Sequence, residues 1–375
     1  MKAETFLDIL QADFFTGVPD SRLRPLTDTL MARYGVNPAR HVVAANEGNA
    51  AALAAGYHLA TGKIPVVYLQ NSGEGNEVNP AASLLHPDVY GIPVLFVMGW
   101  RGEPDLHDEP QHLVQGGITL PLLDLLGISH AILDAATTEE DARRIMDTFR
   151  KGFASGRSAA FVVREGGLTA DKRVYANSFT LRREEALREL LRHIGPDPVF
   201  CSTGKASREL YELRDALGQG HERDFLTVGS MGHTSSIALG YANAWTPPSG
   251  SRVWCLDGDG SALMHLGSMA VIGAHAPRHF LHVVINNAAH ESVGGIPSVM
   301  DKVSLTELAL ACGYTMAKRV ETLEALRASL PTLKKTDGPV LVEICCALGA
   351  RADLGRPVIP PQQSKCAFMK NSLSG

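Results

Sequence analysis

The stretch Gly258-Asp259-Gly260-Ser261, followed further along the chain by Ile285-Asn286-Asn287, decides the fold of this protein. An apolar run, Val253-Trp254-Cys255-Leu256, leads into the first segment, and a second run from Leu281 to Ile285 leads into the asparagines. Short apolar runs bounded by turn residues predict buried strands of a parallel sheet. The carboxyl ends of neighbouring parallel strands share one edge of the sheet, where α/β proteins bind their ligands. We therefore expect both segments at one ligand-binding edge.

The side chains at this edge favour a magnesium-diphosphate site. Asp259 offers a carboxylate and Asn287 a neutral oxygen, and Mg²⁺ prefers a few such hard ligands together with phosphates and water. Gly258 and Gly260 let the backbone turn tightly and approach a diphosphate. A Gly-Asp-Gly sequence alone is often a plain turn, but its position before a strand that ends in two asparagines favours the site.

Composition limits the class of protein. The chain has 375 residues, 45% hydrophobic and 20% charged, with a formal net charge of −5. This length favours two domains, and the charge predicts no nucleic-acid partner. No apolar run is long enough for a membrane span, and the N-terminus does not resemble a signal peptide. The six cysteines are scattered, four of them in apolar runs, so we expect buried free thiols in a reducing cytoplasm.

Two α/β halves are predicted, each with a doubly wound parallel sheet. The first domain spans 1–170, a polar connector spans 171–180, and the second domain spans 181–375. Expected strands of the first domain are 14–15, 41–44, 64–69, 94–98 and 160–163. Those of the second are 198–201, 225–228, 253–256, 281–285 and 340–344. The proline-containing tail from Arg351 is expected to be extended.

Three further segments follow predicted strands, and each has a plain structural alternative. Glu47 begins an alanine-rich helical pattern, and taken alone it is a carboxylate favoured by the helix dipole. Ser230-Met231-Gly232 is a glycine-rich turn from a strand to a helix. The turn at Gly204 resembles a P-loop, but Val199 stands where the first glycine of that motif belongs, so only a weaker anion site made by backbone amides is predicted.

The Gly-Asp-Gly and Asn-Asn motif resembles that of thiamine diphosphate enzymes. Four more segments, listed here, are similar to the phosphonopyruvate decarboxylases among the thiamine diphosphate-dependent 2-oxo acid decarboxylases: 14–21, 99–104, 108–112 and 289–295. The resemblance covers nearly the whole chain, which has no room for the central domain of larger relatives. It implies a pyrimidine-binding domain at 1–170 and a diphosphate- and Mg²⁺-binding domain at 181–375.

The resemblance also implies roles in holding the cofactor. Glu47 would activate thiamine diphosphate through its aminopyrimidine ring, and Met231 would pack beneath the cofactor. Asp259 and Asn287 would bind Mg²⁺ together with the backbone carbonyl of Ala289. The cofactor-binding residues would be Gly204, Ser230, Met231, Gly232, Gly258, Asp259, Gly260, Ser261 and Asn287.

The implied reaction is the decarboxylation of 3-phosphonopyruvate to phosphonoacetaldehyde and CO₂ in phosphonate biosynthesis. Arg101 would bind the phosphonate, because a guanidinium fork suits such a group, with Asp20 also in the substrate site. Ser21 would orient the carboxylate or relay a proton, and His112 and His290 would carry protons because imidazole titrates near neutrality.

Three alternatives stay open: a sulfopyruvate or other 2-oxo acid substrate, carboligation, and a non-catalytic relative. In this family the two cofactor-binding domains come from different subunits, so at least a homodimer with its active site at the subunit interface is expected. Near the substrate loops, four positions or segments depart from the family pattern: Glu74, 105–107, Ala288 and Ile296.

Overall fold

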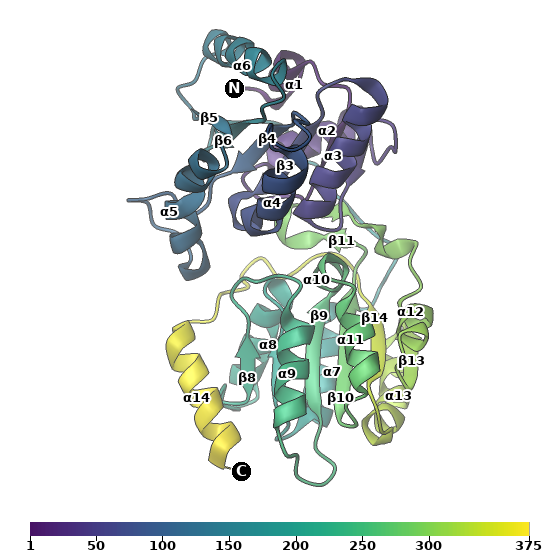
Figure 1. Cartoon of the computed structure of the whole chain (residues 1–375). Coiled ribbons are helices and arrows are strands. Elements are labelled where there is room, and N and C mark those ends of the chain that lie inside the picture. Colours follow the sequence, from purple (N-terminus) through teal and green to yellow (C-terminus); the bar gives the residue numbers. More distant parts are fainter. Residues whose placement is uncertain (375) are drawn as a thin grey trace. The chain divides into compact units, whose positions relative to one another are not determined.

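The structure is a computed structural model that describes residues 1–374, and it divides into two compact units, Met1–Val174 and Tyr175–Gly375. Each unit is built around one six-stranded parallel sheet with helices on both faces (Figure 1). Residues 171–174 of the predicted connector belong to the first unit, and residues 175–180 belong to the second. No helix within residues 1–374 is long and apolar enough to cross a membrane.

The sheet of the first unit has the strand order β2-β1-β3-β4-β6-β5. Its strands are β1 (Phe15–Gly17), β2 (His41–Val43), β3 (Val66–Gln70), β4 (Leu95–Gly99), β5 (Ser129–Leu133) and β6 (Ala159–Val163). Its helices are α1 (Ala3–Leu10), α2 (Arg24–Arg33), α3 (Glu47–Thr61), α4 (Glu74–Pro80), α5 (Pro110–Leu125) and α6 (Glu139–Phe153), with short turns η1 (Asn71–Gly73) and η2 (Ala81–Leu85).

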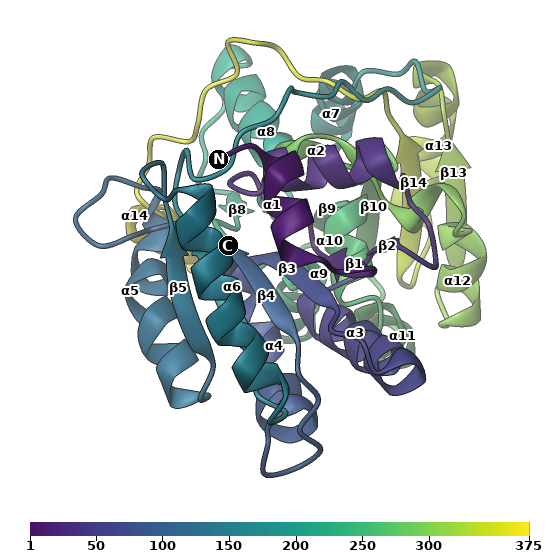
Figure 2. The ribbon, with the colours of Figure 1, turned by 90° about the horizontal axis from the view of Figure 1, so that it is seen from above.

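Both faces of this sheet are buried, because alternate residues of each strand point to opposite sides. Val66 and Tyr68 of β3 pack with Phe6 and Leu26 of α1 and α2, in the core that α6 also covers. Val67 of β3 and the small residues of α3 form a second core on the other face. Figure 2 shows the unit from the side of α1 and α6.

The sheet of the second unit has the order β13-β14-β10-β9-β7-β8. Its strands are β7 (Val199–Cys201), β8 (Asp224–Leu226), β9 (Val253–Gly258), β10 (Phe280–Asn286), β13 (Met316–Val320) and β14 (Val340–Cys345), and a small hairpin pairs β11 (Ala289–His290) with β12 (Ile296–Pro297). Its helices are α7 (Arg183–Ile194), α8 (Lys205–Ala216), α9 (Thr234–Ala244), α10 (Asp259–Met264), α11 (Ser268–His275), α12 (Leu305–Ala311), α13 (Leu323–Lys335) and α14 (Pro361–Ser374), with short turns η3 (Glu291–Val293) and η4 (Val299–Asp301).

The prediction of an extended tail from Arg351 was wrong from Pro361 onward, where α14 is a helix, whereas residues 351–360 form no helix. Proline is well tolerated in the first turn of a helix, so Pro361 can begin one. Phe368 then holds α14 in place, since its ring packs against Phe200, Phe225 and Tyr241. Tertiary packing of one aromatic face therefore outweighs the turn-forming signal of the prolines that precede it.

Candidate functional site

The Gly-Asp-Gly turn and the asparagine pair lie at adjacent strand ends, as the sequence predicted. Strand β9 ends at Gly258, where α10 begins with Asp259, and β10 lies beside β9 with Ile285 opposite Gly258. Asn286 is the last residue of β10, so Asn287 follows directly. The parallel register thus brings the carboxylate and the second asparagine to the same edge of the sheet.

The oxygens at this edge form a compact set around the amide of Ala289. That amide donates to Oδ1 of Asn287 at 3.1 Å and also hydrogen-bonds to the carboxyl group of Asp259. The hydroxyl of Ser298 donates to Oδ2 of Asp259 at 3.1 Å. Burial raises the pKa of Asp259 to about 7, so the ionised form needs a nearby cation. This hard oxygen set fits Mg²⁺.

Asn287 is oriented by a buried ion cluster that the sequence did not reveal. Its Nδ2 donates to Oε2 of Glu291 at 2.7 Å, which directs its Oδ1 away from Glu291. Glu291 pairs with Arg183 and, at 3.1 Å, with the Nζ of Lys205. Arg183 also binds Glu209 through two hydrogen bonds of 2.7 and 2.8 Å. These partners lie on separate elements, so no local pattern could identify them.

Met231, which was predicted to pack beneath the cofactor, lies next to α10. A Cβ placed on Gly260 would lie 3.3 Å from Cε of Met231 and 3.4 Å from Nδ1 of His290, so a side chain there would crowd both. Gly232 has a φ of +89° and its amide donates to Oγ of Ser261 at 3.0 Å. The glycine-rich turn and the start of α10 therefore form one packed surface.

Two more predicted cofactor residues have unusual backbone conformations. Ser230 has a φ of +48° in the same turn as Met231. Gly204 has a φ of +123° just before α8, and an added Cβ would meet no atom within 4 Å. Beside it, the hydroxyl of Ser202 accepts a hydrogen bond from the amide of Gly258 at 3.1 Å. The β7–α8 turn is thereby connected to the Gly-Asp-Gly turn.

One family departure is visible as backbone strain at Ala288. This residue follows the asparagine pair with a φ of +55°, in the left-handed region that favours glycine. Its amide donates to Oδ1 of Asn286 at 2.8 Å, and its carbonyl accepts from the amide of Ser298 at 2.9 Å. These two bonds hold the strained residue between Asn286 and the Ser298 segment.

The two candidate proton carriers are both buried. Burial lowers the pKa of His290 to about 4, so its ring is neutral at physiological pH. The expectation that His290 titrates near neutrality was wrong, because its side chain is enclosed by the β11–β12 hairpin and α10. Its Nε2 has no hydrogen-bond partner among the described residues. His112 lies near the start of α5, where its backbone fits closely around Gly102.

In the first unit, Glu47 is the first residue of α3, directly after the short loop that follows β2. Asn46 caps this helix by accepting the amide of Asn49 at 2.9 Å. The Oε2 of Glu47 accepts a hydrogen bond from Nδ2 of Asn76 at 2.6 Å, and a Cβ on Gly73 would overlap Oε1. Burial raises the pKa of Glu47. A buried carboxyl with a raised pKa is suited to holding or moving a proton.

Two more buried carboxyl groups lie on α4 near Glu47. Glu74, expected in a loop, begins this helix, and burial raises its pKa to about 8. Burial raises the pKa of Glu77 well above its usual value, and the charge of Glu47 adds to the effect. Neither side-chain oxygen of Glu77 has a hydrogen-bond partner among the described residues, whereas a hydrogen bond with the side chain of Thr119 offsets part of the effect of burial on Glu74.

We predict that Glu74→Gln makes the protein more stable at alkaline pH. The folded pKa of about 8 lies above the usual value, so the folded state keeps a proton that the unfolded chain has lost. The protonated carboxyl group of Glu74 stabilises the folded state fully below the pKa that it has in the unfolded chain. This stabilisation is lost as the pH rises through about 8, and the free energy of unfolding falls by up to about 1.4 kcal/mol per pH unit. Melting temperatures across this range should fall less steeply in the variant. The exposed Glu139→Gln serves as control, and equal slopes in wild type and Glu74→Gln would contradict the prediction.

The predicted substrate residues Asp20, Ser21 and Arg101 lie together at the carboxyl edge of the first sheet. Arg101 follows β4, and its Nη1 donates to Oγ of Ser21 at 3.2 Å. Asp20 is buried, and Oδ2 accepts the amides of Arg22 and Leu23 at 3.0 and 3.2 Å. Burial raises the pKa of Asp20 to about 6. The three predicted residues thus form one cluster.

Arg101 also has a partner that the sequence did not assign. Its Nε donates to Oδ2 of Asp108 at 2.8 Å, and Nη2 binds the other carboxylate oxygen. Burial favours the neutral acid, but these bonds and those from the amides of Gly102 and Glu109 outweigh it and lower the pKa of Asp108. Asp108 therefore stays ionised and fixes the guanidinium plane, leaving the outer edge of Arg101 toward Ser21.

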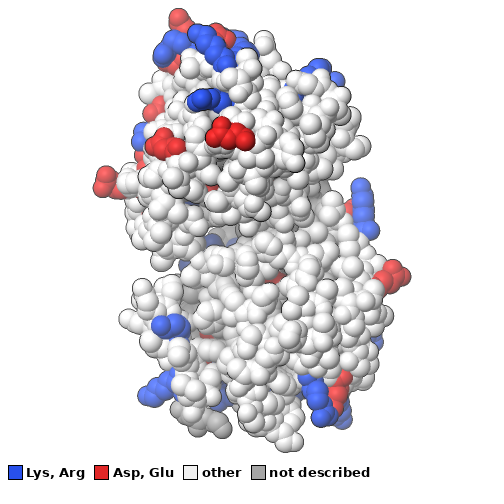
Figure 3. All heavy atoms as spheres, in the orientation of Figure 1, with Lys and Arg blue, Asp and Glu red and all other residues white. Residues whose placement is uncertain are grey.

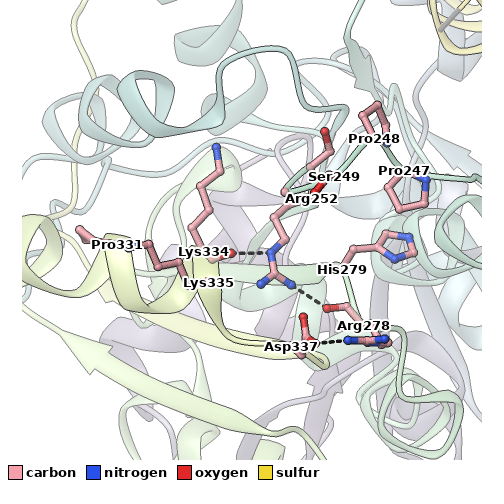
Figure 4. A pocket seen from close by; sticks show the side chains of 12 residues that line it. Pro247, Pro248, Ser249, Arg252, Arg278, His279, Pro331, Lys334, Lys335 and Asp337 are labelled. Atoms are coloured by element: carbon pink, nitrogen blue, oxygen red, sulfur yellow. Dashed lines mark hydrogen bonds and ion pairs between the residues drawn. The ribbon is translucent and has the colours of Figure 1, made fainter.

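A cavity of about 640 Å³ lies at the opposite edge of the second sheet, before β9, β10 and β14. Arg252 points into it but donates to the carbonyls of Lys334 and Arg278, both at 2.6 Å, and to that of Thr336 (Figure 4). Arg278 pairs with Asp337. Arg252 is thus bound to backbone carbonyls and Arg278 to Asp337, and neither side chain is directed at a ligand. The functional site is therefore not placed in this cavity.

Two family models match the chain along its two units. The thiamine pyrophosphate enzyme N-terminal TPP binding domain matches residues 3–121, and the C-terminal TPP binding domain matches residues 202–344. Both sheets and the oxygen set at Asp259 agree with these assignments. The fold and the site together define a thiamine diphosphate-dependent enzyme built from two cofactor-binding domains.

Comparison with curated relatives identifies the family within this class of thiamine diphosphate-dependent enzymes. A phosphonopyruvate decarboxylase of Streptomyces viridochromogenes is 36% identical over 92% of this chain and 88% of its own length. That of Streptomyces hygroscopicus is 35% identical over 92% and 87%. A sulfopyruvate decarboxylase of Methanosarcina acetivorans is 27% identical over 75% of each chain. The chain belongs to the phosphonopyruvate decarboxylase family.

Proposed function

We propose that this protein decarboxylates 3-phosphonopyruvate to phosphonoacetaldehyde and CO₂, in the cytoplasm, with thiamine diphosphate and Mg²⁺. The observation that carries the substrate assignment is the guanidinium of Arg101, which is fixed by Asp108 and contacts Ser21. A fixed guanidinium presents paired donors that match a phosphonate. The free state of all six cysteines agrees with a reducing compartment.

When bound, thiamine diphosphate supplies the electron sink for the bond that breaks. Asp259, Asn287 and the carbonyl of Ala289 would hold the Mg²⁺ that neutralises its diphosphate. Glu291 supports this role, because it orients the amide of Asn287 at 2.7 Å. The packed surface of Met231 and Gly260 would support the ring system, with the turns at Gly204 and Ser230 contributing amides.

Residues of both units would take part in the proton transfers. Glu47, buried and bonded to Asn76 through Oε2, would exchange a proton with the cofactor through Oε1, its other carboxyl oxygen. Ser21 would orient the substrate carboxylate, and the negative charge of Asp20 would be balanced by Arg101. His112 and His290 remain proposed proton carriers. Since its ring is neutral, His290 would act by accepting a proton or by donating one from its neutral ring.

We also propose a homo-oligomer of at least two copies, with each active site formed by two subunits. Helices α3, α9 and α11 carry no lysine or arginine, and their single acidic residue, Glu47, is buried. Figure 3 shows few charged side chains over α9 and α11 in the second unit. Exposed Leu59 and Val271 lie on these helices. Charge-poor faces with exposed apolar side chains suit protein interfaces.

Sulfopyruvate is the second candidate substrate, because a sulfonate would meet the same guanidinium. Sulfopyruvate decarboxylase subunits of 35% and 36% identity cover only 36% and 35% of this chain, and the relative that covers 75% is 27% identical. The phosphonopyruvate decarboxylases keep 35% and 36% identity over 92% of the chain, which favours the phosphonate. A phosphonate also carries up to one more negative charge than a sulfonate, so it gains more from a cationic clamp.

The test compares phosphonopyruvate, sulfopyruvate and pyruvate as substrates for the purified protein with thiamine diphosphate and Mg²⁺. We expect phosphonopyruvate to be preferred in kcat/KM by about 100-fold over pyruvate, about 2.7 kcal/mol of transition-state binding. Arg101→Gln should remove most of this preference and leave pyruvate turnover nearly unchanged. Arg33→Gln, a surface arginine paired with Glu4, is the control. Preferred turnover of sulfopyruvate or pyruvate would overturn the substrate assignment.

A further inference from the structure

A second cluster of ligand-type side chains lies inside the sheet of the second unit. Cys255 and Asp257 of β9 and His282 of β10 are all buried, and one ligand atom from each lies within 4.8 Å of the others. The sheet register places His282 opposite Cys255. The neighbouring Trp254 and Leu256 belong to the apolar core on the other face, so the three side chains share the opposite face.

The polar atoms of this cluster have no hydrogen bonds to one another. Both carboxylate oxygens of Asp257 and Nε2 of His282 have no hydrogen-bond partner among the described residues. Oδ2 and Nε2 lie 3.6 Å apart, beyond the range of up to about 3.2 Å for an N–H···O bond. A buried carboxylate without a partner is costly, and such groups commonly mark an ion or water.

We propose that Cys255, Asp257 and His282 bind a zinc ion. Zinc bonds to thiolate, imidazole and carboxylate at about 2.0 to 2.3 Å in tetrahedral geometry, which places two such N and O ligands about 3.4 Å apart. The observed separation of 3.6 Å between Nε2 and Oδ2 is close to this value. The second oxygen of Asp257, or one water, completes the four ligands.

Charge and ligand type agree with this assignment. A thiolate and a carboxylate carry two negative charges, so a divalent ion makes the buried cluster neutral and removes the cost of an isolated charge. The thiolate favours zinc over Mg²⁺, which prefers oxygen ligands. The proposed Mg²⁺ set around Asp259 contains only oxygens, so the two sites differ in chemistry, although Asp259 directly follows the strand that carries Cys255 and Asp257.

The imidazole also has the support that zinc ligands usually have. Nδ1 of His282 lies 3.1 Å from the hydroxyl of Tyr314, which is buried. Donation from Nδ1 to this oxygen fixes the tautomer whose lone pair on Nε2 faces Asp257 and Cys255. Such outer hydrogen bonds orient metal-binding histidines.

The experiment measures zinc in the purified full-length protein by elemental analysis, after dialysis against a chelator and Mg²⁺. We expect about one zinc per chain in the wild type, and little in Cys255→Ala and His282→Asn. Cys201→Ala is the matched control, because Cys201 is an equally buried thiol on the neighbouring strand β7 and lies outside the cluster. Asp259→Asn should keep its zinc, which separates this ion from the cofactor metal.

If the variants fail to fold, the wild type still decides the question. Replacement of zinc by cobalt should give a thiolate-to-cobalt absorption band in the folded wild type and in Cys201→Ala. Wild-type protein that contains no stoichiometric zinc after expression with added zinc, and that shows no such band with cobalt, would overturn the proposal. Zinc that persists in Cys255→Ala would overturn it as well.

Discussion

Replacement of Glu47 by alanine is expected to lower turnover by at least ~100-fold while thiamine diphosphate still binds, because one acid–base contribution of that size is removed. The carboxyl is buried at the start of α3, its pKa is raised by burial, and Asn76 donates to one of its oxygens. Mg²⁺ and diphosphate binding rest on Asp259 in the other unit, so cofactor affinity should change much less than the rate. Steady-state kinetics and cofactor titration by intrinsic fluorescence measure the two quantities separately.

Glu74→Gln is the matched control for this variant. Glu74 is a neighbouring buried carboxyl on α4, and burial raises its pKa as it does that of Glu47. We expect its replacement to change the pH dependence of stability and to leave turnover within about 10-fold of wild type. Circular dichroism verifies that both variants are folded. Unchanged turnover in Glu47→Ala would refute the role of Glu47.

The sheet edge that carries Asp259 and Asn287 was predictable from the sequence, because the inference depends only on local residue types. Two buried apolar runs indicate parallel strands, and the polar residues after each run must meet at the shared edge. The position of Glu47 at the start of a helix was predictable for the same reason. Strands β5 and β13 were missed because both lie at sheet edges, where partly exposed side chains weaken the apolar pattern.

The supporting partners were not predictable, because they depend on long-range packing. Glu291 can orient Asn287 only because Arg183 reaches it from a helix 108 residues earlier in the chain. Asp108 lies only seven residues after Arg101, yet the pairing depends on the path of the loop between them. The neutral ring of His290 depends on its burial, which residue type alone does not indicate.

Asp259→Asn is expected to abolish Mg²⁺-dependent cofactor binding, with a loss of at least ~100-fold in apparent Mg²⁺ affinity, about 2.7 kcal/mol. Asparagine keeps the shape of the side chain but removes the charge that the metal requires. The same change should raise the melting temperature of the metal-free protein at pH above about 7, because it removes a buried carboxylate whose pKa burial raises to about 7. Stability and function would therefore change in opposite directions at one residue.

The Ser298→Ala variant tests how much of the Mg²⁺ affinity depends on the hydrogen bond to Asp259, because it leaves the charge of Asp259 in place. This variant removes only the 3.1 Å bond to Oδ2, and an outer partner of a metal ligand typically contributes about 10- to 100-fold in affinity. We therefore expect a smaller loss of Mg²⁺ affinity than in Asp259→Asn, with no gain in metal-free stability. Calorimetric titration of Mg²⁺ in the presence of thiamine diphosphate measures both variants. Wild-type affinity in Asp259→Asn would place the cofactor metal elsewhere.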